Sequence, residues 1–339
     1  ALFLDDTKVG LFIGLMLIAI GSGGIKPSVA SNVGDQFGQS NAYLLPRAFS
    51  WYYLGINIGS STSSLMIPWL LAWQGPAVAF GVPGLFMVLA TVTFWAGRHR
   101  FVHVPAAGRS YLRDIFGPEG QRVVRRLLII YILVAAFWSL FDQMGSTWVL
   151  QAMNMDRVVL GYELLPAQIQ AVNPFLIIVL IPIFSYWVYP FLERFFSVTS
   201  PRRMSIGMFL AATPFLVTAW IEAQIQMGFS PHIGWQLLAY LLITIAEVLL
   251  VVTCMASSHT QAPKRMKSLV MALFYLSISA GNLFTALVNQ FIQNTDGTSK
   301  LTGPSYHLFF AAFMGCAALL FAVYMRLYRE EHIIQEESD

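Results

Sequence analysis

The sequence predicts an all-α membrane protein with nine membrane-spanning helices. Of its 339 residues, 57% are hydrophobic and only 11% are charged, against about a quarter charged in an ordinary soluble domain. The apolar residues fall in long uninterrupted stretches, and the basic residues collect on one side of them. A chain this apolar cannot cover itself with polar surface, so we reject a soluble protein with buried helices and expect a lipid environment.

The spans follow from length and composition. A spanning helix needs about 20 mostly apolar residues, because each backbone polar group in hydrocarbon must be paired within the segment. Short polar segments such as Gly75-Pro76 and Ser200-Pro201 separate the stretches that qualify. These stretches are 9–30, 47–72, 76–97, 124–153, 165–192, 203–227, 234–257, 267–292 and 304–328.

The basic residues test this assignment. If the spans alternate across the bilayer and the first polar segment faces outward, one side receives 16 of the 20 Lys and Arg residues. The other side receives Lys8, Arg157 and Lys300, and Lys26 lies within a span. Basic loops stay in the cytoplasm. We therefore expect a cell membrane protein whose first residue is outside and whose C-terminus is cytoplasmic.

The most basic loop divides the chain into three spans followed by six. Transporters are commonly built from two repeated halves of several helices each. We therefore interpret the three spans before the loop as the remainder of a first six-helix half that has lost three helices. Ala1 in place of a starting Met agrees with this interpretation. We expect the second half of an N-terminal bundle at 1–97 and a basic cytoplasmic linker at 98–123. A C-terminal six-helix bundle at 124–329 and a cytoplasmic tail at 330–339 follow.

Ionisable residues inside a membrane are expensive and are functional candidates. Asp142 and Glu247 lie near the middle of their spans. A carboxyl group without a partner in hydrocarbon is more stable protonated than charged. Both acids are candidates to carry protons or to bind a substrate cation, and the alternative is a static hydrogen bond between helices.

Lys26, Asn57 and Asn173 complete the polar candidates. Lys26 lies about a turn from the cytoplasmic end of its span, where its side chain could extend to the interface, but the small residues of Gly21-Ser22-Gly23-Gly24 favour a packed, cavity-lining helix. The two mid-span amides could bind substrate amide groups or join helices to each other. Glu222, near an outer span end, is interpreted as interfacial.

Several segments, in order along the whole chain, resemble the proton-dependent oligopeptide transporter family of the major facilitator superfamily. The segment Tyr52–Ser60 is similar to the family signature F-Y-x-x-I-N-x-G-S, with Tyr52 where Phe is usual. Gly23–Pro27 with Gly34–Phe37 resembles the fourth family helix, and Phe137–Ser146 resembles the seventh. Glu247 with Gln261–Ser268 resembles the tenth helix and the loop after it.

The resemblance implies helices four to twelve of a twelve-helix fold that carries di- and tripeptides with protons by alternating access. It implies that Lys26 binds the peptide carboxylate and takes part in coupling, that Glu247 faces the peptide amino group, and that Asp142 couples protons. It also implies backbone contacts from Asn57 and Asn173, and an aromatic wall position for Phe274. The partners implied are the peptide, protons and the lipid bilayer, with no nucleic acid and no cofactor besides the proton gradient.

The chain departs from the family pattern in three ways, and three other functions are alternatives to peptide transport. The first-helix motif E-x-x-E-R-F is absent from this chain, the central loop is too short for an extra helical pair, and 228–233 leaves no room for a large outer domain. A relative that carries nitrate or another small organic anion stays open. A membrane enzyme is disfavoured because no H-E-x-x-H or G-x-S-x-G occurs and no histidine lies deep in a predicted span. A channel is disfavoured because no filter-like loop recurs.

Overall fold

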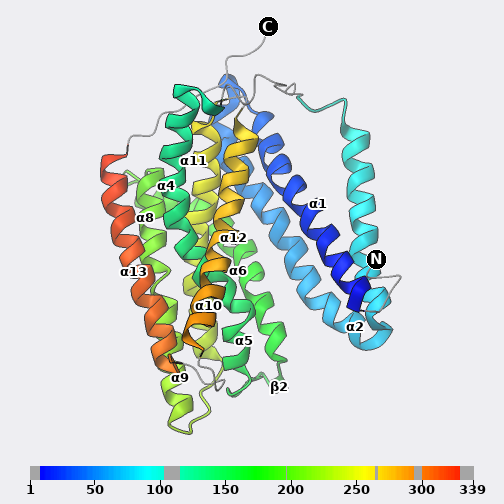
Figure 1. Cartoon of the computed structure of the whole chain (residues 1–339), viewed down its shortest axis with the longest axis vertical. Helices are drawn as coiled ribbons and strands as arrows, with labels where there is room; N and C mark the ends of the chain where they lie inside the picture. The colour runs from blue at the N-terminus through cyan, green and yellow to red at the C-terminus, as the bar shows by residue number, and fades with distance from the viewer. Residues whose placement is uncertain (1–7, 103–114, 196, 264–265, 294–299, 329–339) are drawn as a thin grey trace.

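The computed structural model describes residues 8–102, 115–195, 197–263, 266–293 and 300–328. Two groups of helices make up the molecule (Figure 1). The smaller group holds α1 and α2, and the larger group holds α4 to α13. The tail predicted at 330–339 and the middle of the predicted linker, 103–114, lie outside the described residues.

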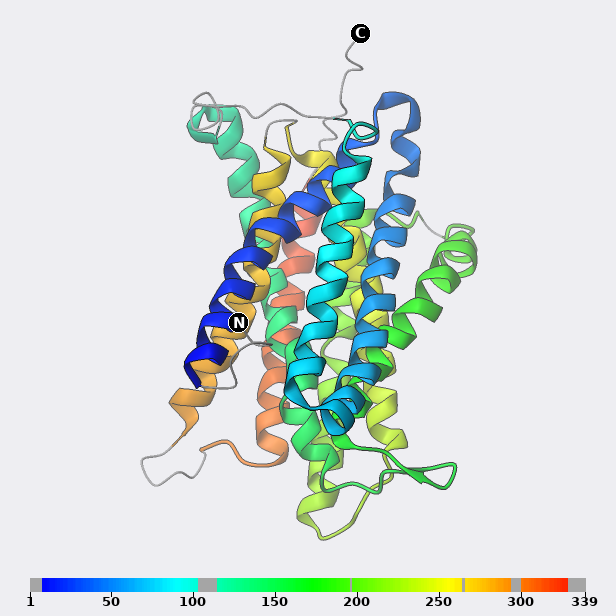
Figure 2. The ribbon, with the colours of Figure 1, turned by 90° about the vertical axis from the view of Figure 1, so that its right-hand side faces the viewer.

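The smaller group has three rods. Helix α1 spans Lys8–Asp35, and the 3₁₀ turn η1 (Gln39–Leu44) leads into α2, Leu45–Gly97. Gly75 has φ 80° and ψ 178° inside α2, a conformation that a residue with a Cβ rarely adopts. The two arms of α2 therefore run in opposite directions from a bend at Gly75 (Figure 2).

The larger group contains helices that are interrupted within the bilayer. Helix α4 (Pro118–Phe141) is followed by the 3₁₀ turn η2 (Asp142–Gly145) and the short helix α5 (Thr147–Ala152). The remaining elements in chain order are η3 (Pro166–Ala171), α6 (Val172–Ile183), η4 (Phe184–Val188), α7 (Tyr189–Leu192), α8 (Ser200–Leu210), α9 (Thr213–Gln226), α10 (Gly234–Glu247), η5 (Val248–Val252), α11 (Thr253–Gln261), α12 (Lys267–Ile292) and α13 (Pro304–Leu327).

Two of these interruptions are π turns. η4 continues α6, and η5 joins α10 to α11, so that Gly234–Gln261 forms one bent rod. Single π turns inside helices occur frequently at functional sites. η5 begins immediately after Glu247, the last residue of α10.

The core lies mainly in the larger group, where α12 packs closely on α4. The contact occurs at Gly281, because a Cβ there would lie 2.5 Å from the Ala135 carbonyl oxygen and 2.8 Å from the Trp138 Cβ. The Thr285 hydroxyl also donates a 2.8 Å hydrogen bond to the Ser139 carbonyl. Gly281 therefore fixes the separation of these two helices.

The two groups meet along two seams. α1 packs on α12, and the first arm of α2 packs on α6 and more lightly on α11 and η5. Polar residues are buried along these seams, and they form the clusters described in the next subsection.

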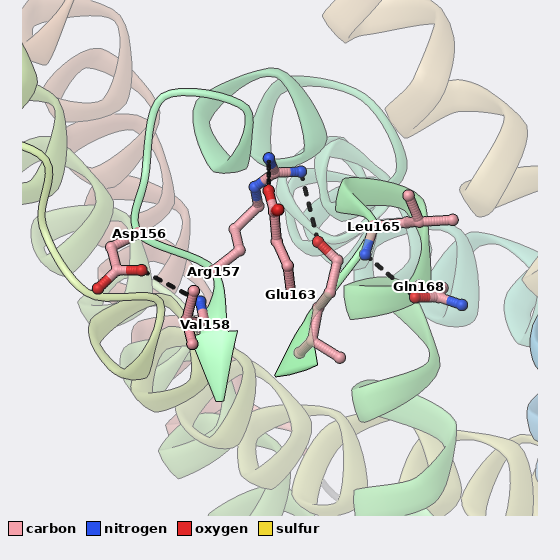
Figure 3. A network of polar contacts seen from close by, with 7 residues as sticks. Asp156, Arg157, Val158, Glu163, Leu165 and Gln168 are labelled. Carbon is pink, nitrogen blue, oxygen red and sulfur yellow. Dashed lines mark hydrogen bonds and ion pairs between the residues drawn. The ribbon is translucent and has the colours of Figure 1, made fainter. Parts of the chain in front are cut away.

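A structured loop follows α5 at one end of the larger group (Figure 1), and its polar contacts are drawn in Figure 3. It contains a two-residue hairpin, β1 (Val158–Val159) and β2 (Tyr162–Glu163). Arg157 donates a 2.6 Å hydrogen bond to Glu163 and a 3.3 Å bond to the Leu164 carbonyl. These contacts hold the polar loop between two spans in a compact conformation.

The predicted spans agree well with the described helices. Eight helices in the described part of the chain are long and apolar enough to cross a membrane, and they match eight of the nine predictions. The ninth prediction, 47–72, is the first arm of α2, which is helical but is not among the eight, since it carries the polar run Ser60-Ser61-Thr62-Ser63-Ser64. The C-terminal bundle also begins earlier than predicted, with α4 starting at Pro118 rather than at 124.

Candidate functional site

Glu247 lies at the centre of a polar cluster between the two groups of helices. Its side chain is 2% exposed, and both carboxylate oxygens accept hydrogen bonds. The Tyr53 hydroxyl of α2 donates to Oε1, and the Asn173 amide of α6 donates to Oε2 at 2.8 Å. A buried carboxylate that is held in this way is oriented by helices of both groups.

Asn173 is fixed in turn by α10. Its Nδ2 also donates a 3.0 Å bond to the Thr244 hydroxyl, which donates to the Tyr240 carbonyl at 2.6 Å. Thr244 and Glu247 are three residues apart and therefore share a face of α10. The predicted amide Asn173 is thus a partner of the predicted acid Glu247.

Asp142 lies at the end of α4, where the helix gives way to the 3₁₀ turn η2. The Asn282 amide of α12 donates a 2.6 Å hydrogen bond to its Oδ2. The side chain is exposed, unlike that of Glu247, and it interacts electrostatically with Lys26 and with Glu247. Asp142 therefore connects the cation of one helix group to the acid of the other.

Lys26 projects from α1 as an exposed side chain in the same region. It lies nine residues before the last residue of α1, or about 14 Å of helix. Because α1 extends to Asp35, five residues beyond the predicted span end at 30, Lys26 lies farther from the end of its helix than the sequence indicated. Lys26 belongs to the smaller helix group, and it interacts electrostatically with Asp142 of the larger group.

We call Lys26, Tyr53, Asp142, Asn173, Glu247 and Asn282 the central cluster. It places one cation and two acids on facing helices, with amide and phenol donors on the acids. Such an arrangement can bind a molecule with opposite charges at its two ends, and its two carboxyl groups, one buried and one exposed, can take up and release protons.

Two predicted site residues lie outside the central cluster. Asn57 is 6% exposed, and its amide donates to the Tyr53 carbonyl of its own helix at 2.9 Å. Phe274 is 1% exposed and packs edge-on against Tyr131, 6.1 Å between ring centroids, and against Trp138. In this conformation Phe274 belongs to the core between α4 and α12, and a substrate-binding role for either residue stays a prediction.

The sequence analysis did not assign roles to Tyr53 and Asn282. Tyr53 stands inside the quoted signature, four residues before Asn57 and hence on the same helix face. Asn282 is an amide within the 267–292 span, so the criterion that selected Asn57 and Asn173 applied to it as well. Tyr52, the departure from the signature, hydrogen-bonds Tyr275 of α12 and forms another link between the groups.

A second polar cluster closes the seam at the C-terminal end of α1, near the start of α12. Asp35 Oδ1 lies 3.6 Å from Lys267 Nζ and 3.7 Å from His259 Nε2. All three side chains are shielded, with His259 at 1% exposure. A Cβ at Gly34 would lie 2.1 Å from His259 Nε2, so Gly34 permits this close approach. We call these three residues the end clasp.

His259 lies outside the predicted spans, as expected from the sequence. It follows the predicted span end at 257 but is buried, because α11 continues to Gln261. His307, three residues after the start of α13, is also buried, and its Nδ1 lies 3.0 Å from the Thr218 hydroxyl. Glu222, expected at the interface, is only partly buried and accepts a 2.9 Å bond from Gln151.

Comparison with known proteins gives one family. Residues 6–118 and 118–305 match the POT family (PTR2). Peptide transporter family 1 of Drosophila melanogaster is 34% identical over 262 residues, which are 66% of this chain and 35% of that protein. Solute carrier family 15 member 2 of Rattus norvegicus is 34% identical over 288 residues, 73% of this chain and 40% of that protein. The chain thus spans less than half the length of these relatives.

Solved structures agree with the sequence comparison. A crystal structure of an auto-inhibited POT family peptide transporter superposes with a TM-score of 0.78 at 34% identity, covering 98% of this chain and 80% of that one. The POT family transporter PepTSo gives 0.77 at 34% identity. These relatives are transporters rather than enzymes and have the major facilitator type of fold. The chain belongs to the POT family.

Proposed function

We propose that the protein containing this chain is a proton-coupled symporter of di- and tripeptides that works by alternating access. The observation that carries the proposal is the central cluster, in which Asp142 interacts electrostatically with Lys26 of the smaller helix group and with Glu247 of the larger one. A peptide without blocking groups is a zwitterion, so it needs an acid at one end of its site and a base at the other. The relative from Drosophila melanogaster, at 34% identity, is named a peptide transporter, and so is a solved structure at the same identity.

In this proposal Glu247 binds the peptide amino group and Lys26 the carboxylate. Asn57 and Asn173 contact the backbone atoms of the peptide, which all peptides share, and Asn173 does so in place of its present hydrogen bond to Glu247. Phe274 forms part of the cavity wall that contacts the side chains of the peptide. Asp142 and Lys26 couple transport to protons, because their mutual attraction changes when either group gains or loses a proton. No cofactor besides the proton gradient takes part.

The proposed orientation follows from the basic residues. The end of α13, the start of α4 and the far ends of both α2 arms lie toward one end of the molecule (Figure 1). These helix ends carry Arg326, Arg122, Arg47 and Arg98, and basic loops are retained in the cytoplasm. We place this end in the cytoplasm and the Arg157–Glu163 loop outside, with the protein spanning the cell membrane several times.

The experiment compares peptides that differ only at the amino end. The assay is proton-driven uptake of a labelled dipeptide by the intact protein in liposomes, with unlabelled peptides as competitors. The N-acetyl form of the dipeptide should compete about tenfold more weakly than the dipeptide itself, because it lacks one charge-assisted hydrogen bond. In Glu247→Gln uptake should fall sharply at normal protein abundance. The two peptides should then compete with similar strength, because the variant lacks the Glu247 charge that distinguishes a free amino group from an acetylated one.

Glu222→Gln is the matched control, since it removes a carboxylate that lies outside the central cluster and should leave uptake unchanged. Wild-type uptake by Glu247→Gln would remove Glu247 from the site. Nitrate uptake that a dipeptide does not compete would instead support the anion-transporting alternative, which the buried carboxylate of Glu247 disfavours.

A further inference from the structure

A small cavity lies at the seam between α2 and the larger helix group, away from the central cluster. Its volume is about 80 Å³, several times the roughly 10–15 Å³ that one water needs. Ser50 of α2 lines one side, while Ser185 of η4 and Arg203 of α8 line the other. A ligand bound here contacts both helix groups.

The lining is suited to an anion. Arg203 is 22% exposed, and its guanidinium stacks on the Tyr189 ring, 4.0 Å from the centroid. Its Nε donates to the Val198 carbonyl at 3.1 Å, whereas no described residue accepts a hydrogen bond from its Nη1. The hydroxyls of Ser185 and Ser200 also have no hydrogen-bond partner among the described residues. The cavity thus offers one planar cation and two hydroxyl donors, the groups that bind phosphate oxygens.

One acid stands near this site but does not neutralise it. Glu193 Oε1 lies 3.7 Å from Arg203 Nη2, and the Glu193 side chain is 56% exposed. Exposed ion pairs of this kind contribute little. An incoming anion can therefore share Arg203 with Glu193, or displace it.

The surroundings indicate a membrane interface. Tyr186 and Trp187, next to Ser185, are both exposed, Trp187 at 78%, and such residues concentrate where lipid headgroups meet hydrocarbon. Arg47, which follows the lining residue Pro46 in the chain, donates a 2.5 Å hydrogen bond to the Tyr186 hydroxyl and is a second cation in this region. At the end placed in the cytoplasm, this depth coincides with the anionic headgroups of the inner leaflet.

We propose that this seam cavity binds the phosphate group of an anionic phospholipid, with Arg203 as its principal ligand and Ser185 and Ser200 as donors. Because the bound headgroup contacts Ser50 of one helix group and Arg203 of the other, it favours the conformation in which this seam is closed. The proposal rests on the orientation given above but not on the peptide substrate. Peptide uptake can therefore be confirmed or lost without affecting it.

The test measures lipid binding rather than transport. The intact protein is purified from bilayers that contain phosphatidylcholine and phosphatidylglycerol, and retained phosphatidylglycerol is counted by native mass spectrometry. Thermal unfolding in detergent is then followed with dioctanoyl phosphatidylglycerol or with inorganic phosphate. We expect stabilisation by the lipid at concentrations where inorganic phosphate has no effect. Equal stabilisation by inorganic phosphate would overturn the lipid assignment in favour of a free phosphate.

Arg203→Gln should weaken lipid binding about tenfold, as expected for the loss of a charge-assisted contact. Arg202→Gln is the matched control, because Arg202 bonds Ser197 instead of lining the cavity. Equal losses in both variants would mean attraction to the surface in general and would overturn the proposal.

A second variant covers the case in which Arg203→Gln fails to fold. Ser50→Leu keeps every charge but fills the cavity from the α2 side, so it should also reduce the retained lipid. Unchanged retention in Ser50→Leu would overturn the proposal.

Discussion

At the scale of single residues, Asp142 differs from Glu247 in its access to solvent. Glu247 is enclosed by Tyr53 and Asn173, whereas Asp142 is exposed and has one described hydrogen-bond donor, Asn282. An acid that exchanges protons with water must be reached by water in part of the cycle. Asp142 meets this condition in the present conformation, and Glu247 does not.

Substitution of Asp142 tests this difference. Asp142→Asn keeps the shape and mimics the permanently protonated acid, so proton-driven accumulation of peptide should fail and uptake should lose its dependence on pH. Peptide-for-peptide counterflow should survive, because exchange needs no net proton movement. Lys26→Ala should show the same pattern, since it removes the partner charge. Measurements of accumulation and counterflow in the same liposomes distinguish the two processes.

The expected pattern has clear contrary outcomes. If Asp142→Asn concentrated peptide with an unchanged pH profile, Asp142 would be a structural hydrogen-bonding residue. If Lys26→Ala still accumulated peptide, the lysine would only extend to the interface.

The sequence predicted the charged members of the central cluster but not their partners. Asp142, Glu247 and Lys26 could be found because any charge within an apolar span stands out. Tyr53 is 194 residues from Glu247, and Asn282 is 140 residues from Asp142. Such pairings depend on how helices pack, and no local pattern encodes them. Phe274 illustrates the same limit, because a span that is apolar on all sides does not reveal which face is buried.

At the scale of secondary structure, the close contact of α4 and α12 depends on a missing side chain. Gly281→Ala places a Cβ within 2.5 Å of a backbone oxygen and should destabilise the protein by about 1–3 kcal/mol, as overpacking does. Gly315→Ala in α13 is the control, since no atom lies within 4 Å of its Cβ position. That change should be neutral or stabilising, because Ala favours helix over Gly. Thermal unfolding of both variants measures the difference, and equal midpoints would contradict it.

The positions of the helices were predictable, but their interruptions were not. Span 267–292 coincides with α12, since apolar length determines where a spanning helix can lie. The π turns after Ile183 and Glu247 begin at the apolar residues Phe184 and Val248, which carry no breaking signal. Gly75-Pro76 was correctly expected to separate two spans, and the positive φ of Gly75 explains how the chain reverses there.

At the scale of the whole molecule, the end clasp and the central cluster join the two helix groups at different depths. In the end clasp Asp35 faces Lys267 and His259, all largely buried. Removal of one partner leaves a buried charge uncompensated, which costs about 3–5 kcal/mol in measured cases. If the two helix groups separate, water can solvate that charge. Removal of Asp35 should therefore favour the conformation in which this seam is open.

Asp35→Ala should therefore expose residues near the end clasp. Ala30 is fully buried in α1, and Ala30→Cys, in a background with Cys254→Ala and Cys316→Ser, should react faster with a water-soluble maleimide. A shift of about 1.4 kcal/mol in the equilibrium gives a tenfold change in rate. Glu163→Ala breaks an ion pair inside the larger group and should leave the rate unchanged. An unaltered rate in Asp35→Ala would show that the clasp does not hold this seam.

The hydrogen bond from Tyr53 to Glu247 has a consequence for the empty carrier. When a transporter changes conformation without a bound substrate, its binding-site carboxylate passes through a state in which it is shielded from water. A charged group is unfavourable there unless it has a hydrogen-bond partner. Here the Tyr53 phenol donates to the buried Glu247 carboxylate, so that the acid has a hydrogen-bond donor without a bound cation. In the proposed function, a peptide amine that binds Glu247 has to replace the hydrogen bond from Tyr53, which has a net value of about 1.5–3 kcal/mol. Under the proposed function, replacement of this bond lowers the net affinity for the peptide and so favours its release on the far side of the membrane.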